Sequence, residues 1–345
     1  MRTIHVLAVG VLTLATAACG ADEPAGDPGK ADDKVITVYS GRSESLVKPV
    51  LEQFQKASGI TVRVRYGDTA QMAAQLLEEG DRSPADVFYA QDAGALGAVA
   101  KKGMFAPLPD AVLNRVPAAY RAADGRWVGV TGRSRVLVYN SDQVTREQLP
   151  ASVFDLTGPA WKGKVAIAPT NGSFQAFVTA LRVQHGEAKA RQFLTGLKAN
   201  DVQIRQNNVQ IVDEVNTGRL AAGLVNHYYV YEKSQETGTP VDALKTKLHF
   251  FPGGDTGALV NVSGVGVLKR SATDADARAL VDYLLGTDGQ TYFRTETHEY
   301  PMVAGVSPEP GLPPLESLPV PKINLNDLDS LEATVAMIKE AGLVT

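Results

Sequence analysis

The sequence has very little cysteine and no excess of positive charge. Cys19 is the only cysteine among 345 residues, so a disulfide within the chain and a cysteine-based zinc site are both impossible. The 34 basic and 38 acidic residues give a net charge of -4, which provides no general attraction to nucleic acid or anionic lipid. We therefore expect no nucleic-acid partner.

Motifs of common hydrolases are also missing. The histidines are scattered and none belongs to an HExxH motif, which argues against a zincin. No GxSxG elbow occurs and no Ser-His-Asp set stands out, so a secreted serine hydrolase is not supported. With 44% hydrophobic and 21% charged residues, the chain is typical of a folded protein that is long enough for two domains. We expect a binding protein and no enzymatic activity.

The N-terminus has the pattern of an export signal. Arg2 precedes a nearly unbroken apolar run over residues 4–18, which is too short to span a bilayer and fits a signal peptide. Small residues precede Cys19, as in bacterial lipoprotein signals, although Thr16 stands where leucine is usual. The pattern predicts a signal peptide over residues 1–18 and a lipid on Cys19. An ordinary cleavage site with an incidental cysteine is the alternative.

Residues 19–34 are rich in glycine, proline, alanine and aspartate, and they contain no bulky apolar side chain. Such a composition predicts a flexible tether. Lipid chains on Cys19 would hold a folded body outside the cytoplasmic membrane. We expect an exported, extracytoplasmic protein whose membrane contact is made through this anchor alone.

Strand and helix patterns alternate from residue 35 onward. The predicted strands of the first series are residues 35–39, 60–66 and 85–89, and the predicted helices are residues 46–54, 72–79 and 96–102. Three strand–helix units in succession predict a mainly parallel sheet. Because Pro49 would disrupt a helix interior, we expect Ser45 to cap the first helix, with the proline in its first turn.

A second α/β series begins at residue 165, and two long extended segments, residues 127–139 and 259–268, flank it. The pattern predicts an α/β fold of two doubly wound lobes joined by two extended crossings, with a ligand cleft between the lobes. The predicted ranges are 35–131 for the first part of lobe 1, 132–262 for lobe 2, and 263–345 for the return to lobe 1 and the C-terminal helices.

The pair Tyr228-Tyr229 follows a predicted strand that ends at Asn226. Phenolate oxygen is a hard anionic ligand that suits Fe³⁺ better than Zn²⁺ or Cu⁺, and a bound cation drives the phenol's deprotonation. Two amphipathic rings at the edge of a core are the alternative interpretation.

Two further features of the sequence suit the binding of an anion. The Gly172-Ser173 turn opens a predicted helix, so its backbone amides can hold negative charge, although a plain helix cap is the more common case. Arg133 and Arg135 lie between two apolar runs and are either surface charges or anion clamps in the cleft.

The chain resembles the ferric-ion-binding proteins of bacterial ABC iron importers, a branch of the type II periplasmic solute-binding proteins. The resemblance covers nearly the whole mature chain. The stretches that carry it include residues 38–42, 78–89, 132–139, 161–164, 226–229, 257–260 and 299–301. The most specific of them are Pro84-Ala85-Asp86-Val87-Phe88-Tyr89 and Tyr228-Tyr229.

The resemblance implies that Tyr228 and Tyr229 are the ferric ligands. It implies a synergistic anion, carbonate or phosphate, whose predicted site comprises Gly172, Ser173, Asn207, Asn226, Arg133 and Arg135. It also implies a monomer that delivers Fe³⁺ to an ABC permease in the cytoplasmic membrane.

Two departures from the family pattern concern the first lobe. Ser43 stands where some members have a ligand histidine, and Gln91 stands where they have a ligand glutamate. Other branches add a third tyrosine at the turn that holds Asn171, Gly172 and Ser173 in this chain. We therefore expect anion-dependent iron binding or capture of a ferric chelate. The side chains predicted to line the opening are Arg42, Ser43, Gln91 and Asp92.

Other functions remain compatible with the same fold. Related binding proteins carry thiamine, polyamines, sulfate or phosphonates, and the altered first-lobe residues leave room for such cargo. A ligand sensor would use the same cleft as a transporter. Adjacent phenols favour iron, because organic cargo does not need them.

Overall fold

The computed structural model describes residues 34–344. The predicted signal peptide, Cys19 and residues 19–33 of the predicted tether lie outside this range. Within it, no helix has both the length and the apolar composition needed to cross a membrane.

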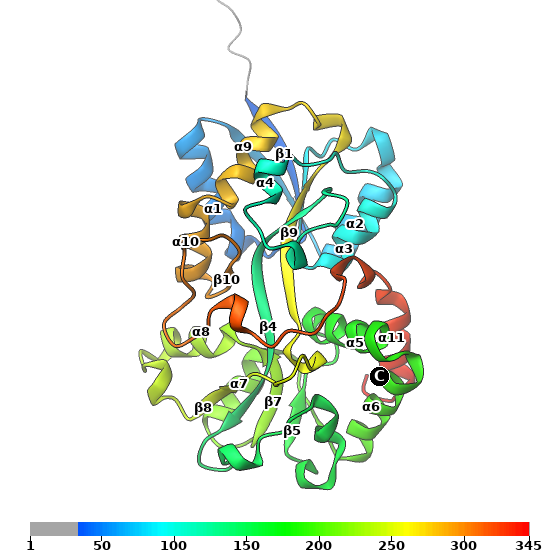
Figure 1. Ribbon diagram of the computed structural model, residues 1–345, viewed down its shortest axis with the longest axis vertical. Coiled ribbons are helices and arrows are strands. Elements are labelled where there is room, and N and C mark those ends of the chain that lie inside the picture. The colour runs from blue at the N-terminus through cyan, green and yellow to red at the C-terminus, as the bar shows by residue number, and fades with distance from the viewer. Residues whose placement is uncertain (1–33, 345) are drawn as a thin grey trace, which may run out of the picture. The chain divides into compact units, whose positions relative to one another are not determined.

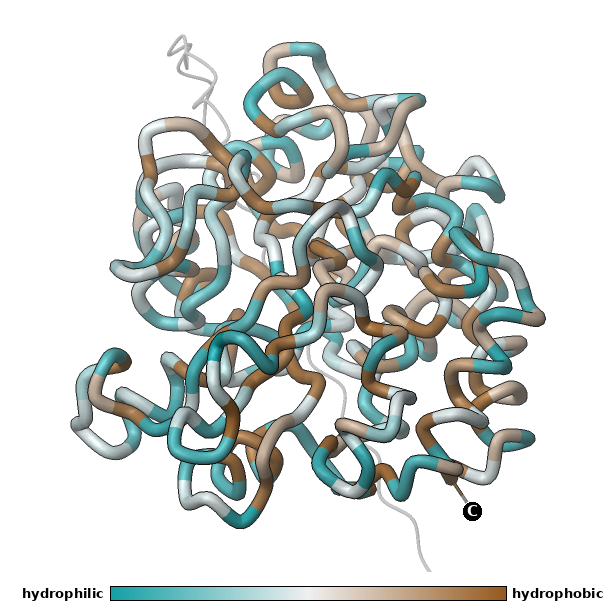
Figure 2. The backbone as a smooth tube through the Cα atoms, turned by 60° about the horizontal axis from the view of Figure 1, so that its bottom comes forward, coloured by the Kyte–Doolittle hydropathy of each residue, from teal (hydrophilic) through white to brown (hydrophobic). Residues whose placement is uncertain are grey.

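The first lobe is built on three parallel strands in the order β2-β1-β3. The strands are β1 (Val35–Ser40), β2 (Thr61–Tyr66) and β3 (Val87–Ala90), and the first four helices are α1 (Glu44–Ser58), α2 (Thr69–Glu79), α3 (Ala93–Lys101) and α4 (Asp110–Leu113). Helix α1 buries Val47, Val50, Leu51 and Phe54, which the helical period places on one side. Figure 2 shows the resulting mixture of hydrophobic and hydrophilic positions along the helices.

Helix α1 starts earlier than the sequence predicted. Its first residue is Glu44, and Ser43 occupies the N-cap position without a side-chain capping bond. Pro49 lies inside the helix, beyond its first turn. The predicted cap at Ser45 is therefore wrong, because the helix continues through the proline and loses one amide hydrogen bond there.

Two long antiparallel strands, β4 (Val128–Asn140) and β9 (Val260–Val267), connect the lobes, and both are buried along their whole length. The first half of β4 pairs with β9, whereas its second half pairs with β7 (Ala222–Asn226) and β8 (Thr246–His249). Figure 1 shows β4 and β9 side by side between the lobes. The predicted lobe boundaries after residues 131 and 262 fall inside these strands and stay predictions.

The second lobe repeats the α/β pattern. Strands β5 (Val165–Ile167) and β6 (Gln203–Ile204) pair in parallel, and β5 also pairs in parallel with β7. Its helices are α5 (Gly172–His185), α6 (Glu187–Ala199), α7 (Asn208–Asn216) and α8 (Tyr228–Thr237). The two lobes and their two connecting strands confirm the predicted fold class.

The C-terminal part of the chain contributes to both lobes. Helices α9 (Ala275–Leu284) and α10 (Thr287–Glu296) contribute to the hydrophobic core of the first lobe, and the short strand β10 (Tyr300–Pro301) pairs with β4. The last helix, α11 (Leu331–Glu340), instead packs against α5, and its Met337 and Ile338 enter the core of the second lobe.

Candidate functional site

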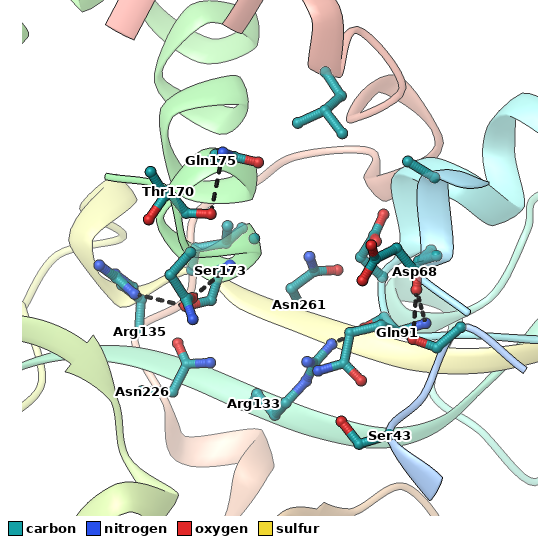
Figure 3. Close-up of a pocket in the computed structure, with 18 of the residues that line it drawn as sticks. Ser43, Asp68, Gln91, Arg133, Arg135, Thr170, Ser173, Gln175, Asn226 and Asn261 are labelled. Carbon is teal, nitrogen blue, oxygen red and sulfur yellow. Dashed lines mark hydrogen bonds between the residues drawn. The ribbon is translucent and has the colours of Figure 1, made fainter. Parts of the chain in front are cut away.

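A cavity of about 470 Å³ lies between the lobes, and most of the predicted site residues line it (Figure 3). The predicted residues on its wall are Ser43, Gln91, Asp92, Arg133, Arg135, Gly172, Ser173, Asn226, Tyr228 and Tyr229. Polar lining residues that were not predicted for the site are Asp68, Thr69, Thr170, Asn171, Gln175 and Asn261. Fold topology therefore gathers residues from eight separate parts of the sequence around one space.

Tyr228 and Tyr229 are the first two residues of α8, just after β7. Their ring centroids are 4.2 Å apart with the planes tilted by 32°, and both side chains reach the cavity. Burial, together with the neighbouring Tyr229, raises the pKa of Tyr228 well above its usual value. Without a cation the Tyr228 phenol is therefore neutral, and a bound metal ion would have to drive its deprotonation.

His227 fixes the turn that leads into the tyrosine pair. Its backbone N–H donates to Ser134 O at 3.0 Å, and its ring Nδ1 accepts from Ser134 N–H at 3.2 Å. The other ring nitrogen, Nε2, donates to His298 O at 3.0 Å. Burial lowers the pKa of His227 to about 4, so the ring is neutral and both nitrogens are occupied. His227 is consequently a positioning residue and leaves no nitrogen free for a metal.

Arg135 and the start of α5 form a polar wall in the second lobe. The Arg135 guanidinium donates to Ser173 Oγ at 3.0 Å and to Leu224 O at 2.8 Å, and it lies over the rings of Phe174 and Phe177. Burial lowers the pKa of Arg135 to about 9, which still leaves it cationic at neutral pH. A buried cation beside a helix N-terminus is well suited to an anion.

The α5 N-terminus is partly capped by its own residues. Asn171 Oδ1 accepts from Ser173 N–H at 2.9 Å and from Ser173 Oγ at 2.6 Å. Gly172 has open space where a Cβ would stand, so the backbone there is accessible from the cavity. Asn226, at the end of β7, lines the same wall.

Asn207 lies elsewhere than predicted. It is exposed and caps α7, with its Oδ1 accepting from Gln210 N–H at 2.9 Å, and it is not on the cavity wall. The next residue, Asn208, is buried instead and donates to Asn171 Oδ1 and Ser173 Oγ, each at 3.3 Å. The helix start turns Asn207 outward, so it is Asn208 that supports the α5 turn.

Arg42 also lies behind the cavity wall rather than on it. Its guanidinium donates two hydrogen bonds to the Glu299 carboxylate, at 2.9 and 2.8 Å, and only 1% of the residue is exposed. Burial alone would raise the pKa of Glu299, but Arg42 and Arg133 together hold it below its usual value. Arg42 was predicted to line the cleft, but its side chain forms a buried ion pair with Glu299 instead.

Arg133 lines the cavity and joins that ion pair from the other side. Its Nε lies 3.5 Å from Glu299 Oε1, and it donates to the main-chain oxygen of Gln91. One carboxylate thus faces two guanidinium groups, so this cluster of Arg42, Arg133 and Glu299 carries a net positive charge next to the cavity. Such a charge favours an anionic ligand or ligand component.

Two α/β lobes joined by long strands and enclosing a polar cavity define a solute-binding protein. Residues 82–327 match the family described as bacterial extracellular solute-binding protein, and the chain belongs to this family.

The chain matches known proteins across nearly their full length. The chain is 37% identical over 313 residues to an Fe(3+)-binding periplasmic protein of Serratia marcescens, covering 90% of this chain and 91% of the relative. It is 34% identical to the major ferric iron-binding protein of Neisseria meningitidis serogroup B, covering 92% and 95%.

Solved structures agree with these sequence relationships. Iron-bound HitA from Pseudomonas aeruginosa superposes with a TM-score of 0.80 at 36% identity, covering 89% of this chain and 99% of that structure. A Trichodesmium protein in complex with iron and citrate gives a TM-score of 0.77 at 29% identity, covering 90% and 100%.

Replacing His227 with alanine should destabilise the protein by about 2 kcal/mol or more, because the buried Ser134 N–H loses its acceptor. Urea unfolding measures the loss. His249→Ala is the control, since this half-buried ring makes one bond, to Pro150 O. Equal losses in the two variants would contradict the positioning role.

Replacing Glu299 with glutamine should cost about 3–5 kcal/mol, because it leaves the buried Arg42 without its counter-ion. The pKa of Glu299 is lowered in the folded state, so its stabilising contribution is present above the unfolded pKa of about 4 and is lost as the pH falls through the folded value. Unfolding measured between neutral and acidic pH should show a smaller acid-induced loss in the variant than in the wild type. A parallel pH dependence would contradict this assignment.

Proposed function

We propose that this protein captures ferric iron in the interlobe cavity, with Tyr228 and Tyr229 as phenolate ligands. The observation that carries the proposal is the adjacent pair of phenols in a cavity that Arg133 and Arg135 also line. The names of full-length relatives that bind Fe(3+) support the same cargo.

The charges of the site suit this chemistry. Fe³⁺ is a hard cation that prefers anionic oxygen, and two phenolates neutralise only part of its charge. The two tyrosines also leave most of an octahedral shell open to other ligands. An anion between the metal and the wall formed by Arg135, Gly172 and Ser173 would fill part of it.

The anion is proposed to be carbonate or phosphate, or the chelator of a ferric complex. The relative solved with iron and citrate supports a carboxylate chelator as one form of the cargo. Closure of the lobes about β4 and β9 would bring the two walls together and exclude water from the metal.

After capture, the protein is proposed to deliver iron as a monomer to an ABC permease, while lipid on Cys19 holds it at the outer face of the cytoplasmic membrane. Mass spectrometry of the protein isolated from membranes should find a lipid-modified Cys19 at the mature N-terminus. Cys19→Ser should release the protein into the soluble extracytoplasmic fraction. An unmodified Cys19, or membrane retention of the variant, would contradict the anchor.

Titration of the protein with ferric citrate, with and without bicarbonate or phosphate, should produce a visible tyrosinate-to-iron charge-transfer band. Tyr228→Phe and Tyr229→Phe should each weaken or abolish it, because each removes one phenolate oxygen. Tyr231→Phe is the matched control, since Tyr231 lies on the same helix but bonds to Pro310 O.

A wild-type protein that shows no band under any anion condition would rule out direct iron ligation. Organic and oxyanion cargo would then be screened by thermal shift. A dependence of the band on the added anion would identify what fills the open positions.

A further inference from the structure

The first-lobe wall of the cavity contains few groups that suit a ferric ion. It has Ser43 and Gln91 but no histidine, tyrosine or glutamate, and among the described residues its carboxylates are Asp68 and Asp92. A cleft that closes over Fe³⁺ with ligands from one lobe alone would place the cation near the Arg133 guanidinium without an anionic ligand from the first lobe. The two aspartates are therefore the candidate first-lobe ligands of iron.

The Asp92 carboxylate is already used as a helix cap. It is the N-cap of α3, and its Oδ1 accepts from Ala95 N–H at 3.0 Å. Burial raises the pKa of Asp92, so its surroundings disfavour the charged form. Using this carboxylate as a ligand would uncap the helix.

The Asp68 side chain, by contrast, does not cap its helix. It occupies the N-cap position of α2 in an extended conformation, the position at which aspartate normally caps, yet its side chain makes no capping hydrogen bond. Its carboxylate instead lines the cavity and is exposed. Figure 3 shows Asp68 across the cavity from Arg135 and Ser173.

The backbone that carries Asp68 is firmly held between two loops. The Thr69 hydroxyl donates to Gly41 O at 2.8 Å and accepts from Gln91 N–H at 3.1 Å. A Cβ at position 41 would clash with Thr69, so only glycine permits this approach. Asp68 is thereby fixed beside the loop that contains Ser43 and beside Gln91.

Gln91 adds a second free oxygen at the same place. Its Oε1 is buried and has no hydrogen-bond partner among the described residues, although the residue lines the cavity. A buried acceptor without a partner is costly and indicates a group that a ligand would satisfy. The two unengaged oxygen groups, Asp68 and Gln91, thus flank Thr69.

We propose that Asp68 is the first-lobe ligand of the ferric ion. The inference rests on the proposed function. As the lobes close, the carboxylate oxygen replaces a water or an anion oxygen on iron already held by Tyr228 and Tyr229. Two phenolates and one carboxylate then balance the charge of Fe³⁺, and Arg133 and Arg135 remain available to the anion. The ligation forms one iron–oxygen bond and involves no redox change.

The test uses the titration with ferric citrate, followed by removal of iron with excess EDTA. Asp68→Asn should still show the tyrosinate band, but the band should shift, and EDTA should remove iron about tenfold faster or more. Asp68→Glu keeps a carboxylate and should restore part of the slow release. Asp81→Asn is the matched control, because Asp81 is an exposed first-lobe aspartate away from the cavity.

The outcomes separate ligation from the other possibilities. If Asp68→Asn shows the band at the wild-type position and releases iron at the wild-type rate, the assignment of Asp68 is overturned while iron binding itself stands. A faster release that disappears at about 1 M salt would also overturn it, because screening at that salt concentration removes a remote electrostatic effect but leaves a bond. Absence of the band from the wild type and every variant would instead refute the proposed function.

Discussion

The pairing of β4 with different partners along its length is the constraint on which the site depends. Up to Ser134 the strand pairs with β9, and from Arg135 onward it pairs with β7. The change of partner places neighbouring residues in different surroundings. Arg133 contacts Glu299 and the Gln91 carbonyl, whereas Arg135 contacts Ser173. One short stretch of chain therefore supplies a cation to each wall of the cavity.

Ser134, between these arginines, links the same strand to the tyrosine pair. Its amide and carbonyl both bond to His227, whose ring in turn bonds to His298 O. The neighbouring Glu299 pairs with Arg42 in the first lobe. A continuous set of buried polar contacts thus runs from the phenols through the connecting strand to the first lobe. These bonds position the tyrosine pair and do not involve the phenol oxygens.

Several predictions from sequence failed where the outcome depended on surroundings outside the local segment. A proline predicts a nearby helix start, but packing of Val47, Val50 and Leu51 carries α1 through Pro49. An arginine after the first strand predicts a cleft charge, but Glu299, more than 250 residues away, draws Arg42 into the interior. Asn207 and Asn208 are chemically identical, and only the α7 geometry decides which is buried.

The sequence by itself determined the α/β class, the two extended crossings and the tyrosine pair, because hydrophobic period, β-branched runs and a rare dipeptide are local signals. It also determined most of the residues that meet at the cavity, through resemblance to a family. Tertiary structure alone decided which side chains are consumed by internal bonds, as Arg42 is, and which line the cavity without a capping bond, as Asp68 does. Partners distant in sequence make that choice, and no local pattern encodes them.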